Sequence, residues 1–199
     1  MKNYVENKSI LITGAGSGFG RLVAQKAVSL GASVTCVDIN KDTLKETADL
    51  LADNKDNVLT VVADVAKAAD MKRAAAESIA AFGKIDVILN NAGIMPLAFY
   101  ADHEAALERW HDCIDINFKG VLNGIACVFD HMMSRGQGHV INMSSIFGNY
   151  PVAGSNVYAA TKAAVNFLSE SLRVEAHGKI KVTTIRPVSY THLTLPTKA

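Results

Sequence analysis

Short apolar runs alternate with helix-period segments from residue 9 to residue 187 of the chain. The runs are rich in β-branched residues and nearly all apolar, which is typical of strands buried on both faces. The segments between them repeat their apolar residues at the spacing of one helix face. This alternation predicts βαβ units, in which helices cover both faces of a parallel sheet. The expected fold class is α/β: a Rossmann-type doubly wound parallel sheet in three αβα layers.

The same pattern places the individual elements. We expect strands at 9–13, 33–38, 57–65, 84–93, 138–145 and 179–187, and helices at 19–30, 41–53, 67–82, 104–134 and 155–177. No linker, repeat or low-complexity segment divides the chain, so residues 1–187 are predicted to form a single domain. In sheets of this type, ligands bind outside the carboxyl ends of the strands, near the point where the strand order reverses.

Charge and composition argue against several classes of partner. The formal net charge is +1, with acids and bases interspersed, so no patch concentrates positive potential for nucleic acid or an anionic membrane. No stretch approaches the roughly 20 apolar residues of a membrane span. The apolar run near the N-terminus is too short for a signal peptide. We expect a soluble, cytoplasmic protein with no nucleic-acid or membrane partner.

The cysteines and histidines are scattered. Cys36, Cys113 and Cys127 lie far apart without CxxC spacing, which argues against a disulfide framework or a zinc site and fits a reducing compartment. His103 and His111 stand eight residues apart, which is a poor spacing for metal ligands. We therefore expect no metal site.

The first predicted strand runs into a glycine-rich turn, TGAGSGFG, at 13–20. Glycines there would let the backbone turn tightly and approach a pyrophosphate, which the N–H groups of the following helix would bind. The alternative is a glycine-rich connector without a ligand, and glycine spacing alone does not decide between the two. The residues expected to contact a dinucleotide in this turn are Gly14, Ser17, Gly18, Phe19 and Gly20.

Asp38 ends the second predicted strand, and Ile39 follows it. A carboxylate there accepts hydrogen bonds from the ribose hydroxyls of adenosine and repels a 2′-phosphate. No Arg or Lys lies at 15–17 or 39–40 to offset this repulsion, so NAD is expected rather than NADP. As an alternative, Asp38 could cap the next helix, but Asn40 is better placed for that role.

YAATK, 158–162, lies near the start of a predicted helix. Tyr158 and Lys162 stand at i and i+4 and therefore share one helix face. An adjacent ammonium favours the phenolate, and a general acid/base works best with a pKa near the operating pH. Lowering a tyrosine pKa by three units needs about 4 kcal/mol of differential interaction. When it stands alone, this motif is more often an aromatic core residue beside a solvated lysine.

Further polar residues fall near the same sheet edge. Ser144 and Ser145 end a predicted strand, where a hydroxyl can hydrogen-bond a substrate oxygen or simply close a turn. NNAG, 90–93, ends another strand, where small residues let the backbone approach a cofactor or form an ordinary turn. Asn117 lies within a predicted helix although Asn is a poor helix former, and by itself it would be incidental.

In this order and spacing the set resembles the short-chain dehydrogenase/reductase family, whose first turn reads TGxxxGxG. The resemblance covers residues 9–187. It implies that Tyr158 is the general acid/base, and that Lys162 lowers its pKa and binds the nicotinamide ribose. Ser145 would steady the substrate oxygen, and Asn117 would hold a water in a proton relay. The reaction implied is hydride transfer between a secondary alcohol and NAD, which gives a ketone.

The resemblance also implies the remaining contacts. Asp64 and Val65 would flank the adenine. The full set expected to bind the cofactor is Gly14, Ser17, Gly18, Phe19, Gly20, Asp38, Ile39, Asp64, Val65, Asn91, Ala92, Gly93, Tyr158, Lys162 and Pro187. An apolar pocket mouth is expected from Met95, Pro96, Ile146, Phe147, Tyr150 and Val152, and it does not distinguish simple alcohols from sterols, sugars or hydroxy acids. The family associates through its two long helices, so a homodimer or homotetramer is implied.

Two other functions stay open. An extended-type NAD-dependent epimerase or dehydratase shares the YxxxK motif, although the TGxxxGxG spacing and NNAG disfavour it. A non-catalytic dinucleotide-binding sensor belongs to a different class, and it would have no need of the Tyr158–Lys162 proton-transfer pair.

The end of the chain departs from the family pattern. In the family the sixth strand ends in Pro-Gly, and a substrate-covering loop, a seventh strand and further helices follow; here Val188 follows Pro187. The peptide VSYTHLTLPT is what one reading frame of a transposon-type sequencing adapter would encode. We expect 188–199 to be a non-native read-through on a truncated chain that lacks the last strand and helices, the alternative being a divergent short C-terminus. The sixth strand would then be an exposed edge, and the pocket would lack its lid.

Overall fold

Six parallel strands form one sheet in the order β3-β2-β1-β4-β5-β6. The computed structural model describes residues 3–188, so the expected read-through segment lies outside the described residues except for Val188. The strands are β1 Ser9–Thr13, β2 Ser33–Asp38, β3 Val58–Val62, β4 Val87–Asn90, β5 Gly138–Met143 and β6 Ile180–Ile185. The order reverses at β1 and β4, and their carboxyl ends border the crevice where such sheets bind ligands.

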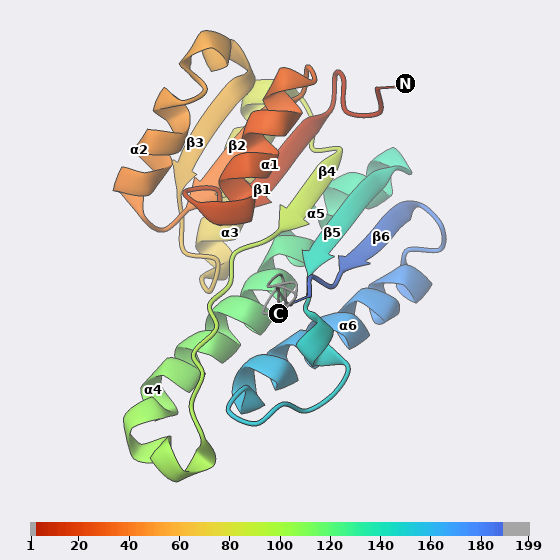
Figure 1. Ribbon diagram of the computed structural model, residues 1–199. Helices are drawn as coiled ribbons and strands as arrows, with labels where there is room; N and C mark the ends of the chain where they lie inside the picture. Colours follow the sequence, from red (N-terminus) through yellow and green to blue (C-terminus); the bar gives the residue numbers. More distant parts are fainter. Residues whose placement is uncertain (1–2, 189–199) are drawn as a thin grey trace, which may run out of the picture.

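Helices cover both faces of this sheet (Figure 1). They are α1 Gly18–Ser29, α2 Lys41–Asp49, α3 Ala68–Phe82, α4 His103–Ile114, α5 Gly120–Arg135 and α6 Asn156–Glu175, with short 3-10 turns at Ala52–Asn57, Tyr100–Asp102 and Ile146–Gly148. The core on one face packs α1 and α2 against the strands, and the core on the other packs α3, α5 and α6. The three-layer α/β fold expected from the sequence is confirmed.

Alternate side chains along a strand belong to different cores. In β1, Leu11 belongs to the core under α3, α5 and α6, whereas its neighbour Ile12 belongs to the core under α1 and α2. Successive side chains of a strand point to opposite faces, so a strand covered on both sides has to be apolar throughout. This requirement explains why the runs read as continuous apolar segments, and both side chains are fully buried.

The expected elements are confirmed, but several bounds differ. β3 ends at Val62, before the end of the predicted 57–65, because the chain leaves the sheet there to line a cavity. The predicted 84–93 was expected to run into a loop, and the strand β4 is confined to Val87–Asn90. The predicted helix 41–53 ends at Asp49 and is followed by a 3-10 turn. The predicted helix 104–134 is one rod in which a π-helical segment, Asp115–Lys119, separates α4 from α5. Single π turns inside α-helices occur frequently at functional sites.

The sheet is not evenly covered among the described residues. On the α1 side, β6 leaves Lys181 and Ile185 exposed, while Val182 on the opposite side is buried under α6. Within residues 3–188, no helix is both long and apolar enough to cross a membrane.

Candidate active site

The glycine-rich turn joins β1 to α1. Gly14 and Gly18 have φ angles of 66° and 52°, in the left-handed region that glycine adopts without strain. A Cβ on Gly20 would lie 2.1 Å from the carbonyl oxygen of Gly14, so no larger residue fits there. Ser17 is the N-cap of α1 but makes no side-chain capping bond. The first N–H groups of a helix have no partner within that helix, so this turn can present them to an anion.

Neighbouring elements hold the turn in place. Asp38, at the end of β2, accepts hydrogen bonds from the backbone N–H groups of Gly16 at 2.8 Å and Asn40 at 2.9 Å. Thr47 of α2 is fully buried and donates to the carbonyl oxygen of Ala15 at 2.9 Å. The carboxylate is therefore oriented by backbone donors, and the turn is anchored from α2.

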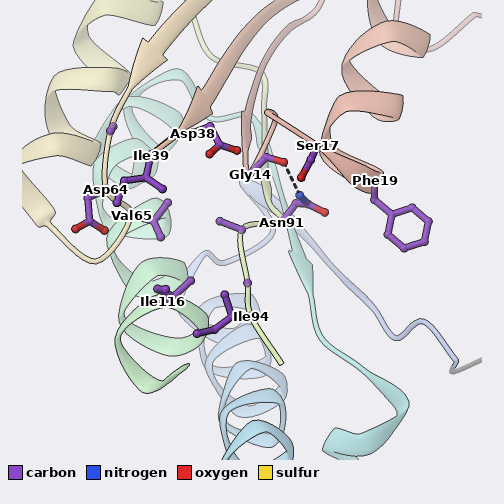
Figure 2. A pocket seen from close by; sticks show the side chains of 14 residues that line it. Gly14, Ser17, Phe19, Asp38, Ile39, Asp64, Val65, Asn91, Ile94 and Ile116 are labelled. Carbon is purple, nitrogen blue, oxygen red and sulfur yellow. Dashed lines mark hydrogen bonds between the residues drawn. The ribbon is translucent and has the colours of Figure 1, made fainter. Parts of the chain in front are cut away.

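The loop after β4 locks onto the same turn. The Thr13 hydroxyl accepts from the N–H groups of Asn91 at 3.0 Å and Ala92 at 3.1 Å. The Asn91 amide donates to the carbonyl oxygens of Thr13 at 3.0 Å and Gly14 at 3.2 Å; Figure 2 marks a hydrogen bond between Asn91 and Gly14. These hydrogen bonds join the segments that follow the carboxyl ends of β1 and β4.

These segments surround a cavity of about 420 Å³ (Figure 2). It is lined by Gly14, Ser17, Gly18, Phe19, Asp38, Ile39, Ala63, Asp64, Val65, Asn91, Ala92, Gly93, Ile94 and Ile116. The expected cofactor residues of the turn, of β2, of the end of β3 and of NNAG are brought together, except Gly20, which lies beneath the turn and does not line the cavity. Tyr158, Lys162 and Pro187 line a second cavity instead.

Three lining residues were missed from the sequence. Ala63 directly precedes Asp64, and Ile94 directly follows NNAG, so extending the motifs by one residue would have found them. Ile116 lies in the π-helical segment, and no local signal in the sequence marks it.

The second cavity, of about 720 Å³, adjoins the first, and both are lined by Phe19, Asn91, Gly93 and Ile94. Ser145, Tyr158 and Lys162 line it together, so the structure brings these three side chains into one space. Asn117 lines neither cavity.

Lys162 is almost fully buried, with 5% of its surface exposed. Its Nζ donates to the carbonyl oxygen of Met143 at 2.9 Å and lies 5.7 Å from the centroid of the Tyr158 ring. Burial lowers the pKa of Lys162 to about 8, and the charge interaction with Cys113 acts in the opposite direction. A Cβ on Gly93 would lie 3.1 Å from Asn117 Oδ1, so a larger residue there would crowd the side chain that holds Ile94.

The two serines after β5 have different roles. Ser144 donates to the carbonyl oxygen of Lys162 at 3.0 Å, which ties β5 to α6. The Ser145 hydroxyl accepts from the N–H of Phe147 at 3.2 Å and, among residues 3–188, donates to no acceptor. Ser145 therefore has a proton to offer a ligand in the cavity, whereas Ser144 does not.

Asn117 is fully buried in the π-helical segment. Its Oδ1 accepts from the N–H of Ile94 at 2.9 Å, and its Nδ2 donates to the carbonyl oxygen of the same residue at 2.8 Å. The Nδ2 group also lies 3.3 Å from the Thr161 hydroxyl of α6. The side chain therefore fixes the loop after NNAG. The expectation that Asn117 holds a water in a proton relay stays a prediction.

The expected pocket mouth is confirmed in part. Met95, Phe147 and Val152 line the second cavity. Pro96, Ile146 and Tyr150 lie in the same two loops but do not line this cavity. The structure adds Leu97, Ala153 and Val188 to the apolar lining.

A comparison with protein families decides the identity of the chain. Residues 8–194 match the family model described as short chain dehydrogenase. The chain belongs to the short chain dehydrogenase family. The matched range runs past Pro187, where we expected the likeness to end. As a member of this family the protein is an oxidoreductase.

Curated relatives carry dehydrogenase or oxidoreductase names. The dehydrogenase is 38% identical over 179 residues to the NADP-dependent 3-hydroxy acid dehydrogenase YdfG of Salmonella typhi, a match that covers 89% of this chain and 71% of the relative. It is 36% identical over 188 residues to an uncharacterized oxidoreductase of Listeria monocytogenes, covering 93% of this chain and 75% of that protein.

Solved structures share the fold. A short chain dehydrogenase/reductase from Burkholderia phymatum in complex with NAD superposes with a TM-score of 0.87 at 31% identity, covering 94% of this chain and 67% of that one. The serine dehydrogenase of Escherichia coli superposes with a TM-score of 0.85 at 36% identity, covering 94% and 85% of the two chains.

The residues of the first cavity fit a dinucleotide. The turn offers helix N–H groups beside Gly18, where a Cβ would meet only open space, and this arrangement suits a pyrophosphate. The fixed Asp38 carboxylate suits ribose hydroxyls, and Ile39 and Val65 offer apolar surface for a base. In the described part of the dehydrogenase, no group of three or more His, Cys, Asp or Glu could hold a metal ion.

Proposed function

We propose that the dehydrogenase interconverts a secondary alcohol and a ketone, with NAD as the cofactor and Tyr158 as the general acid/base. The supporting observation is that Ser145, Tyr158 and Lys162 line one cavity, which adjoins the cavity at the glycine-rich turn. An alcohol held beside Tyr158 would thus lie next to the nicotinamide end of the dinucleotide site.

The side chains divide the work of proton transfer. Tyr158 takes the proton of the substrate hydroxyl during oxidation and returns it during reduction. Ser145 donates its free hydroxyl proton to the substrate oxygen and steadies the charge that develops there. The ammonium of Lys162, in a buried site where charges interact strongly, stabilises the Tyr158 phenolate. A nicotinamide dinucleotide held by the glycine-rich turn and Asp38 would supply the hydride acceptor for oxidation of the carbinol carbon and the hydride donor for reduction of the ketone.

NAD is proposed over NADP because of Asp38. Its carboxylate lines the cofactor cavity and is oriented by two backbone N–H groups, so it would face the adenosine ribose and repel a 2′-phosphate. Arg21, whose guanidinium donates to the carbonyl oxygen of Gly16 in the turn, is also held by Glu46 at 2.8 Å and by the carbonyl oxygen of Thr43 at 3.1 Å. The relative from Salmonella typhi is named as NADP-dependent, so this preference needs its own measurement.

The experiment that tests the function removes the Tyr158 hydroxyl. Tyr158→Phe is expected to lower kcat for the oxidation of a secondary alcohol by at least a factor of 100, because general acid/base catalysis contributes about that much or more. NAD binding, followed by calorimetry, should change less than twofold. Tyr100→Phe, at a tyrosine that is 71% exposed and outside both cavities, is the matched control.

The outcomes separate the alternatives. Substantial turnover by Tyr158→Phe would contradict the role given to Tyr158. NAD binding by the wild-type protein without hydride exchange toward any alcohol or ketone would favour a dinucleotide sensor. Release of NAD unchanged after conversion of a sugar nucleotide would favour an epimerase or dehydratase.

We also infer a homodimer or homotetramer that associates through α5 and α6. A groove between these helices is lined by Leu122, Ile125, Ala126, Phe129, Asp130, Leu168, Ser171, Leu172 and Glu175. On α6, Phe167 and Val174 are 81% and 74% exposed, and residues seven apart share one helix face. Large exposed apolar surfaces mark contact sites.

A cytoplasmic location stays a prediction from cysteine usage.

A further inference from the structure

A strap of chain, residues 94–99, forms one wall of the second cavity and is fastened at both ends. At its start, the Asn117 side chain holds both backbone polar groups of Ile94. Near its end, the Ala98 N–H donates to the carbonyl oxygen of Gly154 at 2.9 Å, and the Asn156 amide donates to the Ala98 carbonyl oxygen at 3.0 Å. The strap is thus tied to α6 just before the turn that carries Tyr158.

Between its fastenings the strap presents apolar side chains. Met95 and Leu97 line the cavity and are 52% and 57% exposed. Phe147, whose ring lies 6.3 Å from the Tyr158 ring in an edge-to-face arrangement, and Val152 line the same cavity. A group attached to a carbinol carbon beside Tyr158 would therefore meet apolar side chains of the strap and of the loop after β5.

Most polar side chains of the same lining make hydrogen bonds within the protein. The Lys162 ammonium donates to the Met143 carbonyl oxygen, the Ser144 hydroxyl to the Lys162 carbonyl oxygen, and the Ser155 hydroxyl to the Val152 carbonyl oxygen. The Asn91 amide donates to the glycine-rich turn. The hydroxyls of Ser145 and Tyr158 face the reacting oxygen in the proposed function, so the apolar side chains of the strap and of Phe147 are left to contact the substituent.

We propose that the preferred substrate is a secondary alcohol whose carbinol carbon carries a bulky, uncharged apolar substituent, aryl or branched alkyl, packed against the strap and Phe147. This inference rests on the proposed function and narrows it. The relative from Salmonella typhi is named for 3-hydroxy acids, whose carboxylate would gain no apolar contact with Met95 and Leu97. Contact between apolar surfaces is favourable in water, so the two substrate classes should differ clearly.

Asn156 is the positioning residue of this wall. Its Oδ1 accepts from the N–H of Val157 at the start of α6, while its Nδ2 holds the Ala98 carbonyl oxygen. Asn156→Asp keeps the acceptor for the helix and removes the donor to the strap. The variant therefore separates the anchoring of the strap from the hydrogen bond that Asn156 makes within the first turn of α6.

The first experiment compares 1-phenylethanol with 3-hydroxybutyrate as reductants of NAD. We expect kcat/KM to be at least ten times higher for 1-phenylethanol, since one methylene in an apolar pocket is already worth about tenfold or more. Leu97→Arg should lower the ratio of the two kcat/KM values at least tenfold, because a guanidinium beside the pocket attracts a carboxylate more strongly than it attracts an aryl ring, and because the apolar surface of Leu97 is lost. Leu50→Arg, at an exposed leucine outside both cavities, is the control.

The second experiment tests the strap with substrates of two sizes. Asn156→Asp should raise KM for 1-phenylethanol at least fivefold with a change in kcat below twofold, and leave KM for 2-propanol unchanged, because only the larger alcohol reaches the strap. Equal effects on both alcohols would overturn the positioning role, since a general loss of structure affects both.

A binding measurement distinguishes failure of this inference from failure of the proposed function. Saturation-transfer NMR with acetophenone on the cofactor-free chain is expected to show binding that Leu97→Arg weakens at least fivefold and Leu50→Arg does not. Turnover of neither alcohol would overturn the proposed function, while the binding result would still decide the substrate class. Preference for 3-hydroxybutyrate, or acetophenone binding that is indifferent to Leu97→Arg, would overturn this inference alone.

Discussion

Asp38 combines two tasks at the residue scale. One carboxylate orients the glycine-rich turn through Gly16 and also lines the cofactor cavity. Removing it should therefore weaken binding of either dinucleotide, while the ratio of the two affinities reports the direct contact of the carboxylate with the adenosine ribose or its 2′-phosphate. A backbone donor that binds a carboxylate makes a stronger hydrogen bond than a neutral pair does, which is why an acid is suited to both tasks.

Asp38→Ser is expected to shift cofactor preference toward NADP. The ratio of the Kd for NADP to the Kd for NAD should fall at least tenfold, because repulsion of the 2′-phosphate and acceptance from the ribose hydroxyls are lost together. Calorimetric titration of both cofactors measures the ratio, and Asp53→Ser, on an exposed turn, should leave it unchanged. Tighter binding of NADP than NAD by the wild-type chain would contradict the proposed preference.

Lys162 has a pH signature. Its pKa in the folded chain is about 8, below the ordinary 10.5, because burial disfavours the charge. The unfolded chain therefore binds more protons between about pH 8 and pH 10.5, and the stability of the cofactor-free protein should rise with pH through this window. Below it, the buried charge costs about 3 kcal/mol.

Lys162→Met should remove that cost. Cofactor-free Lys162→Met is expected to be more stable than the wild type at pH 7, by up to about 3 kcal/mol less the lost hydrogen bond to Met143. The gain should shrink as pH rises toward 10.5. Urea unfolding at pH 7 and pH 10 measures it, with the exposed Lys72→Met as the control. A gain that is equal at both pH values would show that charge burial is not its cause.

At the element scale, the contact of α5 with β4 is unusually close. A Cβ on Gly124 would lie 1.9 Å from Oδ1 of Asn90, whose amide donates to Asn142 at 2.8 Å. Asn142 in turn donates to Ser169 of α6 at 2.9 Å. This buried polar chain links β4, β5 and α6 beneath the second cavity, and it depends on a helix position without a side chain.

Gly124→Ala should destabilise the fold although alanine is the better helix former. Helix propensity alone would favour the change by about 1 kcal/mol, but the methyl group must displace Asn90, and overpacking of this kind costs about 1–3 kcal/mol. Urea unfolding of the variant is compared with Ala76→Gly, an exposed position of α3 where propensity alone acts. Both variants should lose stability; a gain for Gly124→Ala would contradict the close contact.

Most helices and strands could be predicted from the sequence, but one segment could not. Repeating apolar positions predicted each helix and strand, since this signal is local. The π-helical segment and the separation of α4 from α5 were not predicted, because the apolar repeat continues through Asp115–Lys119. What that segment does depends on Ile94, which is distant in sequence, so only the packed molecule reveals it.

At the scale of the whole molecule, the exposed apolar side chains of α6 predict self-association. Phe167→Glu is expected to weaken the dimer at least tenfold, because a desolvated carboxylate would face an apolar partner surface. Sedimentation velocity over a concentration series measures the dissociation constant, and Leu50→Glu, on an exposed leucine away from α6, is the control. A wild-type chain that stays monomeric throughout the series would contradict the inferred assembly.

The fold class, the glycine-rich turn and the candidates Ser145, Tyr158 and Lys162 could be predicted from the chain alone, because strand and helix periods, glycine spacing and an i, i+4 pair are local patterns. Three further facts required the folded molecule: Ser145 rather than Ser144 has a free proton, Asn117 holds Ile94, and Leu97 lines the second cavity. Each of these facts is a contact between segments remote in the chain, and the spacing of residues along one segment carries no information about such contacts.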